Sequence, residues 1–283
     1  MSYSITVKDL SKAFDGKTVL DRIHLGISKG EIFGLIGPSG AGKTTLIRIL
    51  TGQYLQDQGT AAINGIDTRE LSGDDRKRFG ITMDDFGVYE RLSCYDNLKI
   101  FAGIYEVKKE KIDKVLAKVG LSDAAKTPAG KLSKGMTVRL KLARAFMTDP
   151  DVLFLDEPTS GLDPASARAV HRMIVSEKGR GKTVFLTTHT MTEAEKLCDH
   201  IAMLNEGKIV ECGEPKEICR RYDHQRKLMI HLTDGRDMEI PHTKNSGRII
   251  GDLMSTGSVE TVHTSEPDLE TVFLELTGKE LST

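Results

Sequence analysis

The stretch Gly37-Pro-Ser-Gly-Ala-Gly-Lys-Thr44 decides how the rest of this sequence is interpreted. It follows the pattern G-x-x-x-x-G-K-[ST] and lies between an apolar run, Glu31–Ile36, and a segment whose leucines and isoleucines recur at helical spacing. A strand, a glycine-rich loop and a helix in that order form a phosphate-binding loop. A purely structural glycine turn is the alternative, and the position between strand and helix argues against it.

In such a loop, backbone N–H groups and the positive end of the following helix face phosphate oxygens. Lys43 is predicted to reach the β- and γ-phosphates, and the Thr44 hydroxyl to hold Mg²⁺. ATP and Mg²⁺ are the predicted cofactors. The loop residues predicted to contact the nucleotide are Gly37, Pro38, Ser39, Gly40, Ala41, Gly42, Lys43, Thr44 and Thr45.

A second acidic element suits the same chemistry. The apolar run Val152–Leu155 ends in Asp156 and Glu157. A buried strand that delivers acids to its carboxyl end can place Asp156 near Mg²⁺, and Glu157 can polarise an attacking water. Alone this signal is weak, because a strand end with two solvated acids has the same pattern.

Two further segments complete the set of candidates. His189 follows the expected strand Thr183–Thr188 and is predicted at the same sheet edge, where it would contact the γ-phosphate or the attacking water. Ser133 and Gly135 precede a helical stretch and offer a hydroxyl and backbone N–H groups to a phosphate. The alternatives are a structural histidine and an ordinary helix cap at Ser133.

The alternation of short apolar strands with helical segments predicts an α/β fold with a parallel sheet covered on both faces. The region 86–145 is predicted to be helical and charged. The pattern of apolar and polar residues changes near residue 226, where a hairpin signal and two helical patterns predict a small α+β appendage. The expected domains are therefore residues 1–222 and 226–283.

Composition limits the classes of function. The chain has 283 residues with a net charge of −1, which disfavours general attraction to nucleic acid. No apolar run reaches the roughly 18–20 residues that cross a bilayer, and the first residues lack the pattern of a signal peptide. The four cysteines have no metal-binding spacing and are expected to be free thiols. A cytosolic location is expected.

Together these motifs resemble the nucleotide-binding domain of ABC transporters over residues 3–218. The order is that family's, with Walker A, Q-loop, signature, Walker B, D-loop and switch histidine in succession. In this sequence these are Gly37–Thr44, Phe79–Asp85, Leu132–Met136 (LSKGM), Val152–Glu157, Ser160–Asp163 and His189. The segment Lys12–Gly16 is similar to the family's adenine-contacting segment, which implies that Phe14 stacks on the base.

The resemblance implies a P-loop NTPase with a RecA-like core, an antiparallel β subdomain and a helical subdomain. It also implies a head-to-tail homodimer that encloses ATP, with Ser133 and Gly135 contacting the γ-phosphate held by Lys43 of the other copy. Hydrolysis would be carried by Lys43, Glu157 and His189. A separate integral membrane permease is the implied partner, so the subunit is expected at the cytoplasmic face of the membrane.

The sequence departs from the family's pattern at two places. The Q-loop glutamine is absent, and an ungapped alignment puts Asp84 at that position as a candidate Mg²⁺ ligand, with Asp85 as the alternative. The signature carries Lys134 and Met136 where the family has Gly and Gln. The extra charge of Lys134 predicts an altered nucleotide affinity or salt dependence.

The C-terminal segment indicates a particular group within this family. The segment Pro267–Gly278 is similar to the end of ATPases from ABC-2-type exporters of the drug and peptide-antibiotic resistance type. An exporter ATPase is therefore the leading hypothesis. The alternative is a soluble ABC ATPase that acts on nucleic acid or ribosomes. Such proteins usually carry tandem ATPase domains, long coiled coils or zinc modules, and this sequence has none of these patterns.

Overall fold

The computed structural model describes residues 2–83, 87–224, 227–264 and 267–278. These residues divide into two compact units, one that ends at Gly213 and one that begins at Glu214. None of the helices in the described ranges combines the length and the apolar character that a membrane span requires.

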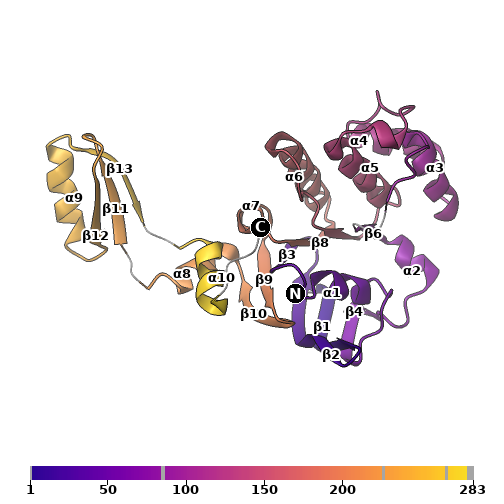
Figure 1. The fold of residues 1–283 in the computed structure, drawn as a ribbon, viewed down its shortest axis with the longest axis horizontal. Coiled ribbons are helices and arrows are strands. Elements are labelled where there is room, and N and C mark those ends of the chain that lie inside the picture. The colour runs from indigo at the N-terminus through magenta and orange to yellow at the C-terminus, as the bar shows by residue number, and fades with distance from the viewer. Residues whose placement is uncertain (1, 84–86, 225–226, 265–266, 279–283) are drawn as a thin grey trace. The chain divides into compact units, whose positions relative to one another are not determined.

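The central sheet of the first unit has the strand order β10-β9-β3-β8-β7-β6 (Figure 1). All neighbouring pairs are parallel except β9 with β10. The strands are β3 (Ile32–Ile36), β6 (Phe79–Thr82), β7 (Val152–Asp156), β8 (Thr183–Thr188), β9 (His200–Asn205) and β10 (Lys208–Gly213).

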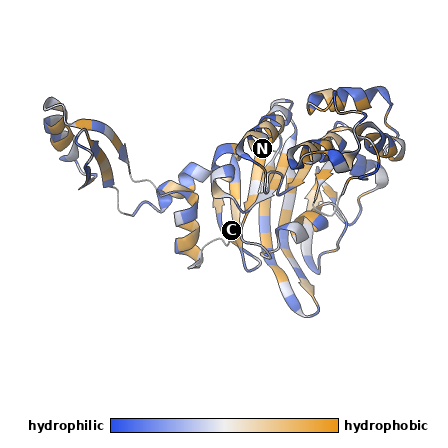
Figure 2. Ribbon diagram, turned by 45° about the horizontal axis from the view of Figure 1, so that its top comes forward, coloured by the Kyte–Doolittle hydropathy of each residue, from blue (hydrophilic) through white to orange (hydrophobic). Residues whose placement is uncertain are grey.

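The inner strands are buried along their whole length because both faces of the sheet are covered. Every residue of β3 and β8 is buried, and β7 is buried up to Asp156. Figure 2 shows much of the central part of the first unit in the hydrophobic colour. In this register Ile36 lies opposite Thr188, and Asp156 lies opposite Thr187. The carboxyl ends of β3, β7 and β8 therefore meet at one edge.

A second, antiparallel sheet of this unit has the order β2-β1-β4-β5. Its strands are β1 (Tyr3–Phe14), β2 (Lys17–Ser28), β4 (Gln58–Ile63) and β5 (Ile66–Asp67). One continuous core joins this sheet, α1 (Lys43–Leu50) and the central sheet, and it contains Leu10, Leu46, Phe154 and Phe185. The core thus holds the helix after the glycine loop firmly against both sheets.

Three helical segments pack together in the region expected to be helical from 86 to 145. They are α3 (Cys94–Ile104), α4 (Glu110–Lys118) and α5 (Lys134–Phe146). The short helix α2 (Gly73–Lys77) precedes them. The helix α5 also contacts β6 and α6 (Pro164–Gly179), so this helical layer is attached to the core near the start of α6.

Local capping explains where the helices near the sheet edge begin. Asp163 accepts hydrogen bonds from the N–H groups of Ala165 and Ser166, and Pro164 occupies the first turn of α6. The hydrogen bonds from Ser166 lower the pKa of the Asp163 carboxyl. The helix α7 (Met191–Leu197) begins directly after the turn that carries His189.

The second unit contains a sheet in the order β12-β11-β13 and three helices, counted among its described residues. Its elements are α8 (Pro215–Arg221), β11 (Lys227–Leu232), β12 (Asp237–Pro241), α9 (Ser246–Ser255), β13 (Val259–Thr264) and α10 (Leu269–Thr277). The expected α+β appendage is therefore present. Leu228, Ile230, Leu232 and Ile240 form its core.

The division between the units lies earlier than the expected end at residue 222. The helix α8 packs against α10 and belongs to the second unit. Both helices are amphipathic, and the sequence does not show which partner covers the apolar face of α8.

Candidate nucleotide-binding site

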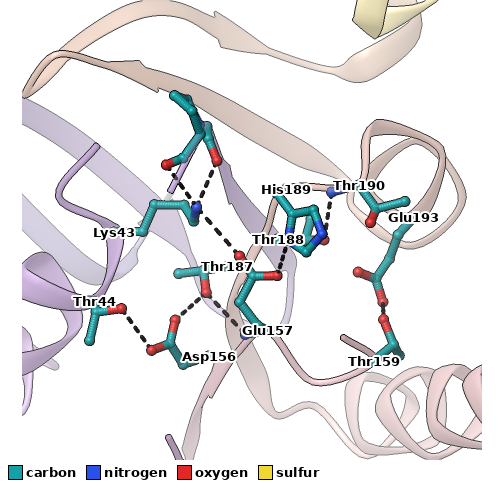
Figure 3. Close-up of polar contacts among 12 residues, drawn as sticks. Lys43, Thr44, Asp156, Glu157, Thr159, Thr187, Thr188, His189, Thr190 and Glu193 are labelled. Carbon is teal, nitrogen blue, oxygen red and sulfur yellow. Dashed lines mark hydrogen bonds and ion pairs between the residues drawn. The ribbon is translucent and has the colours of Figure 1, made fainter. Parts of the chain in front are cut away.

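The candidate residues of three separate segments converge where β3, β7 and β8 end (Figure 3). The loop 37–42 follows β3, Asp156 and Glu157 end β7, and His189 follows β8. Because these are adjacent parallel strands, their following residues share one sheet edge. Lys43 and His189 are far apart in the sequence, but both contact Glu157 in the fold.

Lys43 is almost fully buried and is held by the loop itself. Its ammonium donates to the carbonyl oxygens of Gly37 at 2.6 Å and Pro38 at 3.2 Å. It also lies 3.4 Å from Glu157 Oε1. Gly42, with φ of 112°, precedes α1, and its backbone turn brings Lys43 back toward the loop. The buried charge is therefore fully partnered, and it faces the position where phosphates bind in such loops.

Thr44 and Asp156 form the second contact. The Thr44 hydroxyl donates to Asp156 Oδ2 at 2.8 Å, and the Thr187 hydroxyl donates to Asp156 Oδ1. A hydroxyl and a carboxylate side by side are oxygen ligands of the kind that Mg²⁺ accepts. Thr187 holds the carboxylate from the opposite side, which fixes its orientation toward Thr44.

Glu157 and His189 form the third contact. His189 Nδ1 lies 2.6 Å from Glu157 Oε2, while Oε1 faces Lys43. The Glu157 backbone has φ of 49°, and its N–H donates to Thr187 at both the carbonyl and the hydroxyl oxygen. This left-handed turn directs the carboxylate back across the strand ends. The arrangement places a candidate base between two groups suited to a terminal phosphate.

Comparison with known proteins identifies the family. Residues 20–160 match the family described as ABC transporter. The chain is 40% identical over 260 residues to a fluoroquinolones export ATP-binding protein of Mycobacterium tuberculosis, covering 90% of this chain and 86% of that protein. The chain belongs to the ABC transporter family.

Other similarities extend this result. A Nod factor export ATP-binding protein of Cupriavidus metallidurans is 30% identical over 99% of both chains. A solved structure of an ATP-binding subunit of an ABC transporter matches with a TM-score of 0.70 and 27% identity, covering 78% of this chain and 93% of that chain. The P-loop NTPase fold and the activity of an ABC ATPase, which binds and hydrolyses ATP, are thereby confirmed.

The ABC ATPase carries its candidate adenine-stacking residue at the end of β1. Phe14 is 39% exposed, and its ring packs edge-on against Tyr54 with centroids 5.5 Å apart. Lys12 lies 5.1 Å from the Phe14 ring centroid and pairs with Asp57, whose other carboxylate oxygen accepts the N–H of Ala13. The hydrogen bond from Lys12 lowers the pKa of Asp57. This network holds an exposed aromatic ring in place.

We expect Phe14→Ala to raise the KM for ATP. Stacking of a base on an aromatic ring contributes about 1–3 kcal/mol, which corresponds to roughly 5- to 150-fold. Phe14→Tyr should retain the wild-type KM because the stacking surface is kept. Steady-state ATPase assays of both variants test this, and an unchanged KM in Phe14→Ala would show that the base binds elsewhere.

The signature residues of the ABC ATPase lie on a different element from the phosphate-binding loop. Ser133 caps α5 by accepting the N–H of Met136 at 3.3 Å, and its side chain is exposed. Gly135 is buried against Ser166 of α6, where a Cβ would lie 2.6 Å from the hydroxyl oxygen. The Lys134 ammonium lies against Gly161 of the D-loop. The structure thus does not join Ser133 to the site around Lys43 of the same chain.

One candidate ligand lies outside the described residues. Asp84, and its alternative Asp85, fall in the segment 84–86, so the Q-loop is described only as far as Met83. The proposed Mg²⁺ contact of Asp84 stays a prediction.

Sequence reasoning missed the residues that hold the site in place. Thr187 binds both Asp156 and the backbone of Glu157, and Thr159 donates to Glu193 of α7. Tyr54 supports Phe14. Thr187 is one of three buried threonines in β8, and a buried hydroxyl needs a partner, which was a weak signal that did not single out this residue. Thr159, Tyr54 and Glu193 carried no comparable signal.

Proposed function

We propose that this ABC ATPase powers an exporter through a separate transmembrane permease. The relatives named above are an export protein for fluoroquinolones and one for Nod factor, and a further relative is a lantibiotic transport protein of Streptococcus pyogenes with 36% identity over 89% of its length. These cargoes differ widely in chemistry, so no cargo is assigned. Acting with a permease places the subunit at the cytoplasmic face of the membrane.

In this proposal Lys43 holds the phosphates, Thr44 and Asp156 hold Mg²⁺, and Glu157 accepts a proton from the attacking water. His189 contacts the γ-phosphate. The convergence of these residues at one sheet edge is the observation that carries the proposal. The hydroxyl of Thr44 and the carboxylate of Asp156 fit a hard divalent cation. The loop 37–45 would hold the phosphates through its backbone N–H groups.

The functional unit of the proposal is a head-to-tail homodimer. Ser133 is exposed at the start of α5, and it has no role in the site of its own chain. In a dimer it and Gly135 complete the site of the other copy. A solved dimeric ATP-binding cassette bound to ADP and phosphate shares the fold, with a TM-score of 0.67 at 23% identity.

The partner can be identified by copurification. The full chain carrying a tag, extracted from native membranes in mild detergent with ATP, should bring down an integral membrane protein in a fixed ratio. Membranes from cells that carry the empty vector serve as the control. Recovery of RNA or ribosomal proteins in place of a membrane protein would favour the alternative, a soluble ATPase acting on nucleic acid. The net charge of −1 speaks against that outcome.

A further inference from the structure

A buried carboxylate that the hydrolysis mechanism does not use lies beside the site. Glu193 of α7 is 5% exposed. Its Oε1 accepts the hydroxyl of Thr159 at 2.5 Å and lies 2.9 Å from His171 Nε2 of α6 (Figure 3 shows the contact with Thr159). A buried carboxylate costs free energy unless it is hydrogen-bonded. The two partners offset that cost here, so the question is what this buried contact does for the site.

The contact joins the two chain segments that carry Glu157 and His189. Thr159 follows Glu157 by two residues, and Glu193 follows His189 by four. Glu157 and His189 already touch at 2.6 Å. The bond between Thr159 and Glu193 therefore joins the same two chain segments a second time, just beyond the reacting groups. Together the two contacts and the intervening chain form a closed ring.

The segment after Glu157 is tied to α7 by the bond between Thr159 and Glu193. It leaves the sheet in a left-handed turn at Glu157, and local turn bonds follow, from Ser160 N–H to the Glu157 carbonyl and from Leu162 N–H to the Thr159 carbonyl. On one side it borders a groove of about 520 Å³, which is also lined by His171, His189 and Glu193. The hydrogen bond from Thr159 to Glu193 crosses the edge of that groove and joins the segment to α7.

We propose that Glu193 is a positioning residue for hydrolysis: by holding Thr159, it keeps the Glu157 carboxylate and the His189 ring in the relative positions that hydrolysis needs. His171 in turn orients Glu193 from α6. This inference rests on the proposed roles of Glu157 and His189. Glu193 does not touch Lys43, Thr44 or Asp156 through any contact found in the described residues, so nucleotide binding should not depend on it.

Steady-state kinetics separate this role from a structural one. Misplacing a reacting group by about 1 Å can lower a rate by about 100-fold. We expect Glu193→Ala to lower kcat roughly 10- to 100-fold while the KM for ATP stays within about twofold of wild type. Glu193→Gln should recover part of kcat because its amide oxygen still accepts from Thr159.

The partner residue gives an independent and milder test. Thr159→Val removes one hydroxyl at nearly constant volume, so it should fold even if Glu193→Ala does not. It should lower kcat as Glu193→Ala does, whereas Thr159→Ser should restore it. If the two residues act through one bond, the double variant Thr159→Val/Glu193→Ala should be no slower than the slower single variant.

Glu177 is the matched control. It is also a buried glutamate of this unit, at the end of α6, where it contacts Lys118 and accepts from Arg180 at 2.8 Å. Glu177→Ala should lower the melting temperature without changing kcat per folded molecule.

Three results would overturn the inference: Thr159→Val with wild-type kcat, additive losses in the double variant, or a loss of kcat in Glu177→Ala as large as that in Glu193→Ala at an equal drop in melting temperature. A wild-type chain without ATPase activity would instead contradict the proposed function itself.

Discussion

Glu157→Gln should bind ATP with near wild-type affinity and hydrolyse it about 10²- to 10⁴-fold more slowly, because a positioned general base contributes that much to a rate. Glutamine keeps the size of the side chain and can still contact His189, which lies 2.6 Å away. It loses the negative charge that accepts the proton from water. Binding of a fluorescent ATP analogue and release of phosphate are the two measurements.

The same variant should accumulate as an ATP-bound dimer, because hydrolysis no longer opens it. Sedimentation with and without ATP detects this association, and the wild-type chain provides the control. Normal turnover in Glu157→Gln would remove Glu157 from the role of base. A dimer that forms equally without ATP would contradict the nucleotide-enclosed arrangement.

Lys43→Ala should abolish measurable ATP binding, in contrast to Glu157→Gln. The ammonium is 7% exposed and pairs with Glu157 at 3.4 Å. With nucleotide bound the ammonium would pair with phosphate oxygens, and truncating one partner of a buried charge pair across a binding interface costs about 2–5 kcal/mol, or roughly 30- to 4,000-fold in affinity. Because the loop carbonyls of Gly37 and Pro38 also lose their donor, the loop itself should become less ordered.

Isothermal titration with ATP measures the loss for Lys43→Ala. Lys29→Ala, which removes an exposed lysine on the same unit, is the matched control and should bind as wild type does. A Lys43→Ala protein that binds ATP normally would show that the backbone N–H groups alone hold the phosphates.

The strands and the acids at their ends were predictable because they follow simple rules. A run of five or six residues between turns that is rich in apolar and β-branched side chains predicts a buried strand, and parallel strands place their carboxyl ends together. Asp156 and His189 are consequently found where the pattern puts them. Thr187 was not predicted, because threonine is a common strand residue and its hydroxyl function appears only when β7 and β8 are paired.

Other features depended on tertiary contacts. Glu193 has the sequence context of an ordinary helix residue, and only the approach of α7 to the segment after Glu157 shows its partner. The first unit ends at Gly213 and the expected domain end was residue 222; the two differ because the packing of α8 against α10 is not a local property of the chain. Adenine stacking by Phe14 was inferred from the resemblance of its segment and stays a prediction, while its packing against Tyr54 required the fold.

The left-handed backbone at Glu157 sets stability against activity at a single residue. A long side chain in this conformation costs on the order of 1–3 kcal/mol, which glycine avoids entirely and asparagine avoids in part. Neither replacement reaches His189 and Lys43 as glutamate does. A population of variants selected only for thermal resistance should therefore drift toward glycine or asparagine at position 157. A population selected for ATP turnover should keep the strained glutamate and offset its cost in stability by substitutions elsewhere in the fold.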